Sequence, residues 1–374
     1  MSLGVAILGS TGSIGRSALA VLDRHPDLYH VVALAAHRNA AELSAQIEKY
    51  RPRSAVLVEG NGGPWQTGRD ALLEVARHPD VDVVINAVVG AAGLEATLAA
   101  LEAGKRLALA NKESLVAGGP LVLHALHRGG GELVPIDSEH SAILQCLAGQ
   151  ERCVKRLILT ASGGPFRTLS PELFAQVTPA QALRHPTWDM GAKITIDSAT
   201  LANKALEVIE AHFLFDIAYD RIDVVVHPQS IIHSMVEFVD GSVLAQMGFP
   251  TMELPILYAL TFPERVADTG VRGFDPVAAG TLTFEPVDPI RFGAFRLGVE
   301  AGRIGGTMPA VFNAANEVAV AAFLAGNLPF GAIAEVIDAS LQAHSCQPVD
   351  SLETVLRADA DARAVANEAL KQRC

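Results

Sequence analysis

The sequence contains few cysteines, few aromatic residues and little positive charge. Four of the 374 residues are cysteine, 5% are aromatic, and 29 Lys and Arg stand against 41 Asp and Glu. No cysteine pair has the Cys-x-x-Cys spacing, and no cysteine lies at ligand spacing from a histidine, so common zinc motifs are excluded. We expect reduced thiols in a cytoplasmic protein. The net charge of -12 argues against nucleic acid as the main partner.

Long apolar runs are also absent. No run of about 20 uncharged apolar residues is present, so we expect no membrane partner and no membrane-spanning helix. The N-terminus lacks a basic segment followed by a cleavage site, so we expect no signal peptide. Hydrophobic residues nevertheless make up 50% of the chain, which is enough for two or three domains with apolar cores.

The first third of the chain alternates short apolar runs with helical patterns. Strands are predicted at 5–8, 31–35, 55–58, 81–89 and 106–110, and helices at 14–24 and 94–103. Apolar strands separated by helices are typical of a parallel sheet that is covered on both faces. We therefore predict an α/β fold in which residues 1–137 form a Rossmann-like, doubly wound parallel sheet that binds a dinucleotide.

The pattern changes after residue 137. Strand patterns at 156–160 and 223–226, and a hairpin over 232–247 with an Asp-Gly turn, predict a central α+β catalytic domain at 138–262. Residues 263–289 are rich in Pro, Gly and Asp and predict a linker. From 290 to 374 the periodicity is helical, most strongly at 308–325 and 351–371, which predicts a C-terminal helical domain.

A glycine-rich segment follows the first predicted strand and opens the first predicted helix. In this position glycines let backbone N–H groups approach a pyrophosphate at a helix N-terminus; the alternative is a purely structural turn. The second strand ends in basic residues where NAD-binding domains usually carry an acid, which favours NADP over NAD; the alternative is a surface arginine. The cofactor-binding candidates here are Gly9, Thr11, Gly12, Ser13, Ile14, Gly15, His37, Arg38 and Asn39.

Polar residues also follow the predicted strand at 106–110. The carboxyl ends of parallel strands line the ligand crevice, so we expect Asn111, Lys112 and Glu113 to bind the cofactor, with Lys112 near the nicotinamide. The alternative is a helix start with Asn111 as its N-cap, and both can hold at once because capping leaves Lys112 free.

Two carboxylates, Asp137 and Glu139, follow the predicted strand at 132–136. At alternate positions of an extended chain they would leave on the same face. Carboxylate oxygens without a neighbouring base suit a hard divalent cation. The alternative is a solvated turn.

Three later segments have the residue types of a phosphate site with a lid. The turn at Ser162, followed by two glycines, exposes N–H groups and a hydroxyl; an ordinary turn is the alternative. Segment 197–207 has helical period, with Asp197 as the expected N-cap. We predict that Ser198, Asn203 and Lys204 bind a phosphate and that Glu207 binds a metal. The alternative is a Glu–Lys ion pair on the surface. The irregular segment around His185, Trp188 and Met190 predicts a lid, or a loop that Trp188 fixes to the core.

These motifs occur in one order, and two more follow them: His-Pro-Gln-Ser at 227–230 and Asn-Ala-Ala-Asn-Glu at 313–317. Together they closely resemble the 1-deoxy-D-xylulose 5-phosphate reductoisomerase family over almost the whole chain. The resemblance implies an oxidoreductase of the non-mevalonate isoprenoid pathway. It would isomerise its sugar phosphate with Mg²⁺, Mn²⁺ or Co²⁺ and reduce the product with NADPH to 2-C-methyl-D-erythritol 4-phosphate.

The resemblance also implies roles for individual residues and a homodimer. Lys112 and the carboxylates Asp137, Glu139 and Glu207 would be catalytic, and the three carboxylates would bind the metal. The substrate would contact Ser138, Ser162, His185, Trp188, Met190, Ser198, Asn203, Lys204 and His227.

Three residues depart from the family pattern. Ala202 and Ala205 stand where methionine and glycine are expected, and His37 stands where glycine is more usual. Two rival functions remain open on the sequence. One is another NADP-dependent dehydrogenase that uses Lys112 and needs no metal, and the other is a non-catalytic NADPH-binding sensor.

Overall fold

The structure is a computed structural model that describes residues 2–372. The chain forms two compact units, and each is built from several separate stretches of sequence. The first unit comprises residues 1–114, 121–141 and 251–272, and the second comprises residues 115–120, 142–250 and 273–374. The four-segment division at 137, 262 and 289 rests on composition and stays a prediction.

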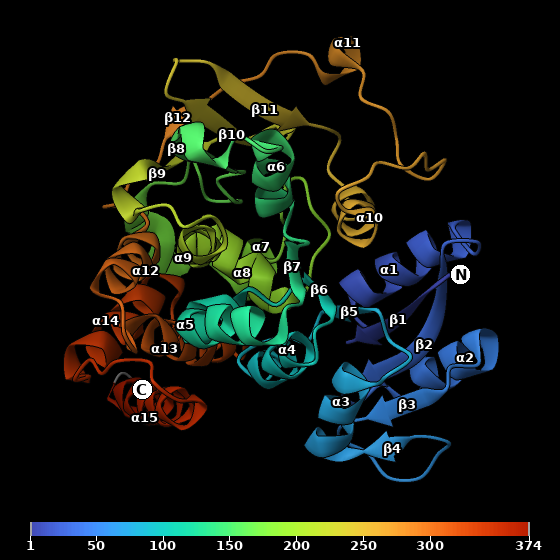
Figure 1. Ribbon diagram of the computed structural model, residues 1–374. Coiled ribbons are helices and arrows are strands. Elements are labelled where there is room, and N and C mark those ends of the chain that lie inside the picture. Colours follow the sequence, from blue (N-terminus) through green and yellow to red (C-terminus); the bar gives the residue numbers. More distant parts are fainter. Residues whose placement is uncertain (1, 373–374) are drawn as a thin grey trace. The chain divides into compact units, whose positions relative to one another are not determined.

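The first unit is built on a seven-stranded sheet with the order β4-β3-β2-β1-β5-β6-β7 (Figure 1). Every pairing between neighbouring strands is parallel, which confirms the doubly wound α/β prediction. The strands are β1 (Leu3–Leu8), β2 (Tyr29–Ala36), β3 (Ser54–Leu57), β4 (Gln66–Thr67), β5 (Val83–Asn86), β6 (Arg106–Leu109) and β7 (Glu132–Pro135).

Helices connect these strands in sequence, except that β3 runs to β4 without a helix between them. They are α1 (Ser13–Arg24), α2 (Ala40–Tyr50), α3 (Gly68–Arg77), α4 (Gly93–Glu102) and α5 (Lys112–Gly129), and α10 (Glu253–Thr261) packs against α1. The predicted strand at 81–89 is too long, because β5 ends at Asn86. There the Asn86 side chain accepts from the Val88 N–H (3.2 Å) and turns the chain.

The second unit contains a five-stranded mixed sheet with the order β11-β10-β8-β9-β12. Its strands are β8 (Val154–Ala161), β9 (Ile222–Val226), β10 (Ile232–Phe238), β11 (Val243–Met247) and β12 (Glu285–Pro286). The predicted hairpin is confirmed, because β10 and β11 pair antiparallel and Gly241 of the turn has a φ of 87°.

The helices of this unit surround an apolar core. They are α6 (Ser138–Leu147), which begins in the first unit, α7 (Pro179–Ala182), α8 (Ala192–Thr200), α9 (Ala202–Phe215), α11 (Pro276–Ala279), α12 (Gly293–Ile304), α13 (Met308–Leu324), α14 (Ile333–Ala343) and α15 (Leu352–Lys371). The predicted helices at 308–325 and 351–371 are thus confirmed. Helix α13 is the centre of the core, with Phe312 and Phe323 almost fully buried.

Ala202 and Ala205, which depart from the family pattern, lie in this core with no exposed surface. A methyl group added to Gly298 of α12 would lie 2.6 Å from Cβ of Ala205. Helices α9 and α12 therefore pack closely because Gly298 leaves room for the alanine. The same packing fixes the direction of α9, which carries three of the predicted site residues.

Within residues 2–372, no helix combines the length and the apolar character that a membrane crossing requires.

Candidate active site

The glycine-rich loop between β1 and α1 is tightly constrained by its neighbours. Gly9 has a φ of 89°, and a Cβ there would lie 2.5 Å from the Ala87 carbonyl oxygen. A Cβ on Gly15 would lie 2.4 Å from the Gly9 carbonyl oxygen. Gly12 is the N-cap of α1 and has no side chain to cap the first turn. The first turn can therefore offer N–H groups and a positive dipole end to a phosphate.

The basic residues after β2 share one acidic partner. Arg38 contacts Glu59 (Nη2 to Oε2, 2.6 Å), and His37 contacts the other oxygen of the same carboxylate (Nε2 to Oε1, 2.9 Å). Hydrogen bonds from Arg38 and then His37 lower the pKa of Glu59 below its usual range. All three side chains are exposed, so Glu59 holds Arg38 at the surface where an anion could replace it.

Asn111 is the N-cap predicted for this helix, but Lys112 is not left free by it, and its place near the nicotinamide stays a prediction. Asn111 caps α5 by accepting from the Ser114 N–H (3.1 Å). Lys112, at the first position of the helix, is almost buried, and its Nζ lies 2.7 Å from the Asp137 carboxylate. Within the first unit, an ammonium group thus lies against the carboxylate that follows β7.

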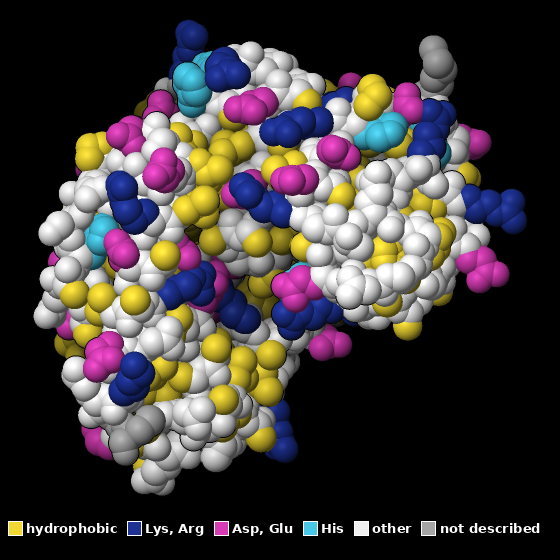
Figure 2. Space-filling model, turned by 90° about the horizontal axis from the view of Figure 1, so that it is seen from below, with side chains coloured by type: hydrophobic (Ala, Val, Ile, Leu, Met, Phe, Trp, Pro, Cys, Tyr) yellow, Lys and Arg dark blue, Asp and Glu magenta, His cyan; other side chains and the backbone are white. Residues whose placement is uncertain are grey.

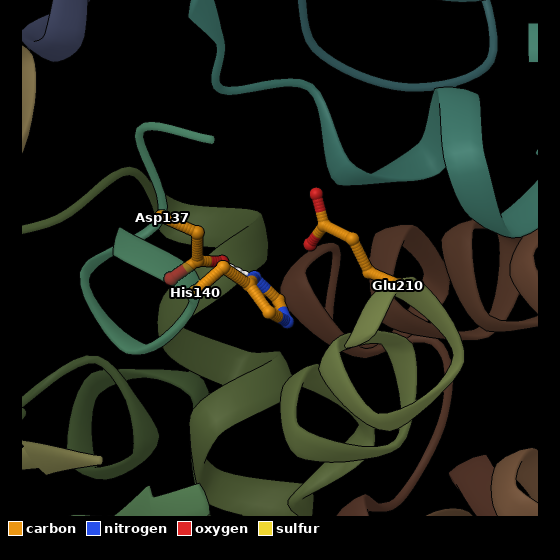
Figure 3. A group of neighbouring side chains, drawn as sticks. All are labelled: Asp137, His140 and Glu210. Atoms are coloured by element: carbon orange, nitrogen blue, oxygen red, sulfur yellow. Dashed lines mark ion pairs between the residues drawn. The ribbon is translucent and has the colours of Figure 1, made fainter. Parts of the chain in front are cut away.

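Asp137 follows the end of β7, and its carbonyl accepts from the Ser141 N–H (2.8 Å) to open α6. The prediction that Asp137 and Glu139 share a face of an extended chain is therefore wrong, since helix begins at Ser138 between them. The fully buried His140 has its Nδ1 4.0 Å from Asp137 (Figure 3). Glu139 instead accepts from the Ser138 hydroxyl (2.5 Å).

In the second unit, two serine hydroxyls converge on one imidazole. His185 Nε2 lies 3.0 Å from Ser162 Oγ and 3.1 Å from Ser198 Oγ. Its other nitrogen, Nδ1, accepts the backbone N–H groups of Thr187 (3.1 Å) and Trp188 (2.9 Å). Nδ1 therefore carries no proton, and Nε2 is the hydrogen-bond donor towards the serines.

Gly164 allows the serine turn to approach α8 closely. It has a φ of 65°, and a Cβ there would lie 2.7 Å from the Ser198 carbonyl oxygen. Its N–H donates to Ser162 Oγ (3.2 Å). The cluster of Ser162, His185 and Ser198 is called the hydroxyl cluster below. It presents hydroxyl and N–H donors together, which suits an oxyanion.

Asp197 and Ser198 lie in the last turn of α8, so the prediction of Asp197 as an N-cap is wrong. The helix starts earlier, at Ala192, and breaks at Leu201, which has a φ of 57°. Asp197 Oδ2 bonds Lys193 Nζ one turn before it (2.8 Å). The break at Leu201 restarts the chain as α9, which carries Asn203, Lys204 and Glu207.

Glu207 is buried on α9 and is bound by its own helix. Lys204, three residues earlier, and Asn203, four residues earlier, both donate to the Glu207 carboxylate. The three side chains predicted to act together therefore do lie together. Glu210, also buried and labelled in Figure 3, lies one turn further along α9.

The remaining predicted substrate residues lie in different settings. Trp188 and Met190 are half-buried in the irregular segment between α7 and α8, and the Trp188 ring lies 6.2 Å from that of His233. The lid role of this segment stays a prediction.

His227 is fully buried, with Nδ1 on the Thr283 carbonyl oxygen (2.9 Å) and Nε2 accepting the Ile231 N–H (3.2 Å). The protein thus engages both ring nitrogens of His227.

Charged side chains of both signs lie on the face of the molecule that Figure 2 shows. On the face in Figure 2, Lys and Arg side chains alternate with Asp and Glu among the described residues, and no continuous basic stripe crosses it.

Comparison with known proteins identifies the family. Three family models match in chain order: 1-deoxy-D-xylulose 5-phosphate reductoisomerase at residues 5–119, its C-terminal domain at 133–215, and the DXP reductoisomerase C-terminal domain at 247–365. The 1-deoxy-D-xylulose 5-phosphate reductoisomerase of Heliobacterium modesticaldum is 54% identical over 97% of this chain and 96% of its own length. The chain belongs to the 1-deoxy-D-xylulose 5-phosphate reductoisomerase family. The family resemblance seen in the motifs is thereby confirmed.

Other members of the family are similarly close. The Pseudomonas aeruginosa 1-deoxy-D-xylulose 5-phosphate reductoisomerase is 50% identical over 97% of both chains. The Zymomonas mobilis reductoisomerase, solved in complex with NADPH, superposes with a TM-score of 0.92 at 43% identity and covers 99% of both chains. A DOX-P reductoisomerase solved with NADPH, fosmidomycin and magnesium gives a TM-score of 0.92 at 39% identity, over 99% of this chain and 98% of that one.

Several residues described above were not predicted from the sequence. Glu59 is far from Arg38 in sequence, and no local pattern predicts their pairing. Glu210 had a usable signal, because an acid three residues after Glu207 shares its helix face. The roles of Gly164 and Asn316, which contacts Asp197, depend on packing between elements that the sequence does not reveal.

The hydrogen bonds of His185 predict a pH-dependent loop. Burial lowers the pKa of His185 below its usual 6.5, so the neutral ring prevails at pH 7. Protonation on acidification removes the acceptor at Nδ1 and frees the Thr187 and Trp188 N–H groups. In a Trp65→Phe variant, the fluorescence of Trp188 should therefore change with a midpoint below pH 6.5.

A matched His185→Gln variant should show no such transition. A midpoint at or above pH 6.5, or a transition that persists without His185, would contradict the role of its neutral ring.

Proposed function

We propose that this chain converts 1-deoxy-D-xylulose 5-phosphate to 2-C-methyl-D-erythritol 4-phosphate, by an isomerisation and an NADPH-dependent reduction that require a divalent metal. Family membership over nearly the whole chain supports the reaction. The observation that carries the substrate assignment is the hydroxyl cluster, with two serine hydroxyls within 3.1 Å of His185 Nε2. Such a group of donors suits a phosphate.

The first unit would bind NADPH. The Zymomonas mobilis relative is solved with NADPH, and the loop of Gly9, Gly12 and Gly15 here has the close backbone packing that a pyrophosphate site needs. Arg38 is an exposed guanidinium that can exchange Glu59 for the 2′-phosphate. NADPH supplies the hydride for the reduction.

The second unit would hold the substrate. Ser162, Ser198, Asn203 and Lys204 would bind its phosphate, with His185 donating from Nε2. Phosphate binding away from the reacting carbons can supply energy for orientation and closure of the segment with Trp188 and Met190. Lys204 would also contact the substrate hydroxyls, and His227 would form the rear of the pocket. Ser138 of the first unit stays a predicted substrate contact. Lys112, the first residue of α5, would act at the catalytic centre.

Asp137, Glu139 and Glu207 fit a divalent metal by their chemistry. All three offer carboxylate oxygens, which are the ligands that Mg²⁺ and Mn²⁺ prefer. Asp137 already binds the ammonium of Lys112 at 2.7 Å, and Glu207 binds that of Lys204, so both carboxylates are held where a cation is stabilised. A bound metal supplies Lewis-acid stabilisation of negative charge on the substrate oxygens. A reductoisomerase relative is solved with magnesium.

We further propose a homodimer that forms through β11. This strand is at the edge of its sheet, and Val243 and Leu244 are 48% and 44% exposed. An edge strand with apolar side chains offers unpaired backbone groups to a second copy. Sedimentation equilibrium should give twice the chain mass of 39.4 kDa; a mass of one chain at micromolar concentration would contradict the dimer.

Each of the four predicted segments would have a different role. Residues 1–137 would bind NADPH, 138–262 would supply the catalytic groups, 263–289 would link, and 290–374 would support the core. Cys146, Cys153 and Cys346 form no disulfide among the residues that the structure describes, and we propose a cytoplasmic location.

The function itself is tested by NADPH oxidation at 340 nm with 1-deoxy-D-xylulose 5-phosphate and Mn²⁺, followed by excess EDTA. We expect turnover that EDTA abolishes and added metal restores. Turnover that persists in EDTA would remove the metal requirement. NADPH binding without turnover would instead favour the non-catalytic sensor.

Replacing Glu207 with glutamine should separate metal use from cofactor binding. Glu207→Gln removes a ligand charge, so we expect Mn²⁺ activation to weaken by at least about tenfold, while NADPH affinity stays near that of the parent chain. The measurement is turnover against Mn²⁺ concentration, with NADPH binding followed by fluorescence.

Glu237→Gln is the matched control, because Glu237 is a largely buried carboxylate of the same unit that is paired with Lys155 (2.7 Å). It should leave Mn²⁺ activation unchanged. Equal effects of the two substitutions would remove Glu207 from the metal site.

Arg38→Ala should weaken NADPH binding by about tenfold or more, the effect of losing one hydrogen bond to a charged group, and should change NADH binding much less. The control is Arg53→Ala, since Arg53 is also an exposed arginine of this unit with a carboxylate partner, Asp80. Dissociation constants for both nucleotides give the answer. An equal loss for NADPH and NADH would refute the 2′-phosphate contact.

A further inference from the structure

The Asn-Ala-Ala-Asn-Glu motif at 313–317 has no role in the reaction as described so far. It lies in the middle of α13, where Asn313 and Asn316 have no exposed surface and apolar residues surround them. Asparagine is a weak helix former, and burying its amide is costly unless the amide is hydrogen-bonded. Helix stability and core packing alone would favour apolar residues at both positions.

Asn316 bonds a residue next to the hydroxyl cluster. Its Nδ2 donates to Asp197 Oδ1 at 2.8 Å, in a pair that joins α13 to α8. Its own Oδ1 has no hydrogen-bond partner among the residues that the structure describes. Only the Nδ2 end of the Asn316 amide is thus hydrogen-bonded, so this residue lowers the stability of the folded state relative to an apolar residue. Its contact with Asp197 therefore calls for a role other than stability.

Asp197 is held on both sides. Its side chain is 1% exposed, with Oδ1 on Asn316 and Oδ2 on Lys193 Nζ at 2.8 Å. A buried carboxylate with two fixed donors cannot rotate without losing one of them. Because Asp197 lies in the last turn of α8, this contact fixes the rotation of that turn about the helix axis.

Ser198 is the next residue of the same turn. Its Oγ lies 3.1 Å from His185 Nε2, and its carbonyl would meet any side chain at Gly164. Successive residues of a helix point about 100° apart, so the direction of Asp197 sets that of Ser198. A small rotation of α8 would move the Ser198 hydroxyl out of the hydroxyl cluster.

We propose that Asn316 is a positioning residue for the substrate phosphate: it holds Asp197, and through Asp197 it aims Ser198. This inference rests on the proposed function, in which Ser198 binds the phosphate. It assigns the Asn-Ala-Ala-Asn-Glu motif to substrate binding, although no residue of the motif is placed in contact with the substrate.

The test compares steady-state kinetics of the full chain with those of Asn316→Ala. We expect KM for 1-deoxy-D-xylulose 5-phosphate to rise by about tenfold, with kcat and KM for NADPH changing by less than about threefold. Loss of folded protein would lower apparent kcat at unchanged KM, so the split between the two constants separates positioning from simple destabilisation.

Asn313→Ala is the matched control. Asn313 is equally buried on the same helix, one turn earlier, but its Nδ2 donates to Glu317 (3.0 Å) rather than to α8. Its substitution should leave KM for the sugar phosphate unchanged. An equal rise in KM for Asn313→Ala would mean general softening of α13 and would overturn the proposal.

A double-mutant cycle with Ser198→Ala tests the route of the effect. If Asn316 acts through Ser198, adding Asn316→Ala to Ser198→Ala should change KM by less than about twofold. Additive effects would overturn the proposal. Absence of turnover in the parent chain would instead refute the proposed function, so the two failures are distinguishable.

Asn316→Ser is the second variant if Asn316→Ala does not fold. It keeps a buried hydroxyl, but its shorter side chain does not reach Asp197, so the same rise in KM is expected. An unchanged KM in this variant, or failure of both variants to fold, would make Asn316 a stability residue and overturn the proposal.

Discussion

Two ion pairs between a lysine and a carboxylate, at buried or nearly buried positions, hold the predicted site residues in place. In the first unit Lys112 lies against Asp137, and in the second Lys204 lies against Glu207. Buried ion pairs contribute little net stability, because desolvation offsets most of their attraction. Each pair lies near a change in backbone geometry: Lys112 opens α5, Asp137 follows the end of β7, and Lys204 lies in the first turn of α9 after the break at Leu201. The proposed catalytic and metal-binding roles of these residues therefore explain the two pairs better than a gain in stability does.

Much of the fold could be predicted because its signals are local. Apolar runs of four or more residues predicted the strands of the parallel sheet except the two-residue β4, and an Asp-Gly turn predicted the β10–β11 hairpin. The glycine loop and the Asn111 cap were also predicted, since turn and capping chemistry depends on adjacent residues. The groups Asn203, Lys204 and Glu207 could be placed together because helix periodicity brings them to one face.

What could not be predicted depends on long-range packing or on a boundary. Strand β7 ends one residue before the boundary assumed from its apolar run, and α6 begins at Ser138, so Asp137 and Glu139 do not alternate on a strand. Aspartate is a common N-cap residue, yet α8 starts five residues before Asp197. Asp197 bonds Lys193 and Asn316 instead. The partners of Asn316 and Arg38 lie 119 and 21 residues away, and no periodicity connects them.

We propose that the Asp137 carboxylate, which follows β7, is a ligand of a divalent cation. The most direct measurement is a titration of the metal-free chain with Mn²⁺, in which electron paramagnetic resonance detects free Mn²⁺ without NADPH or substrate. We predict one site per chain, with affinity reduced by at least about tenfold in Asp137→Asn. A chain that binds no Mn²⁺, or that binds it equally well after this substitution, would contradict the account.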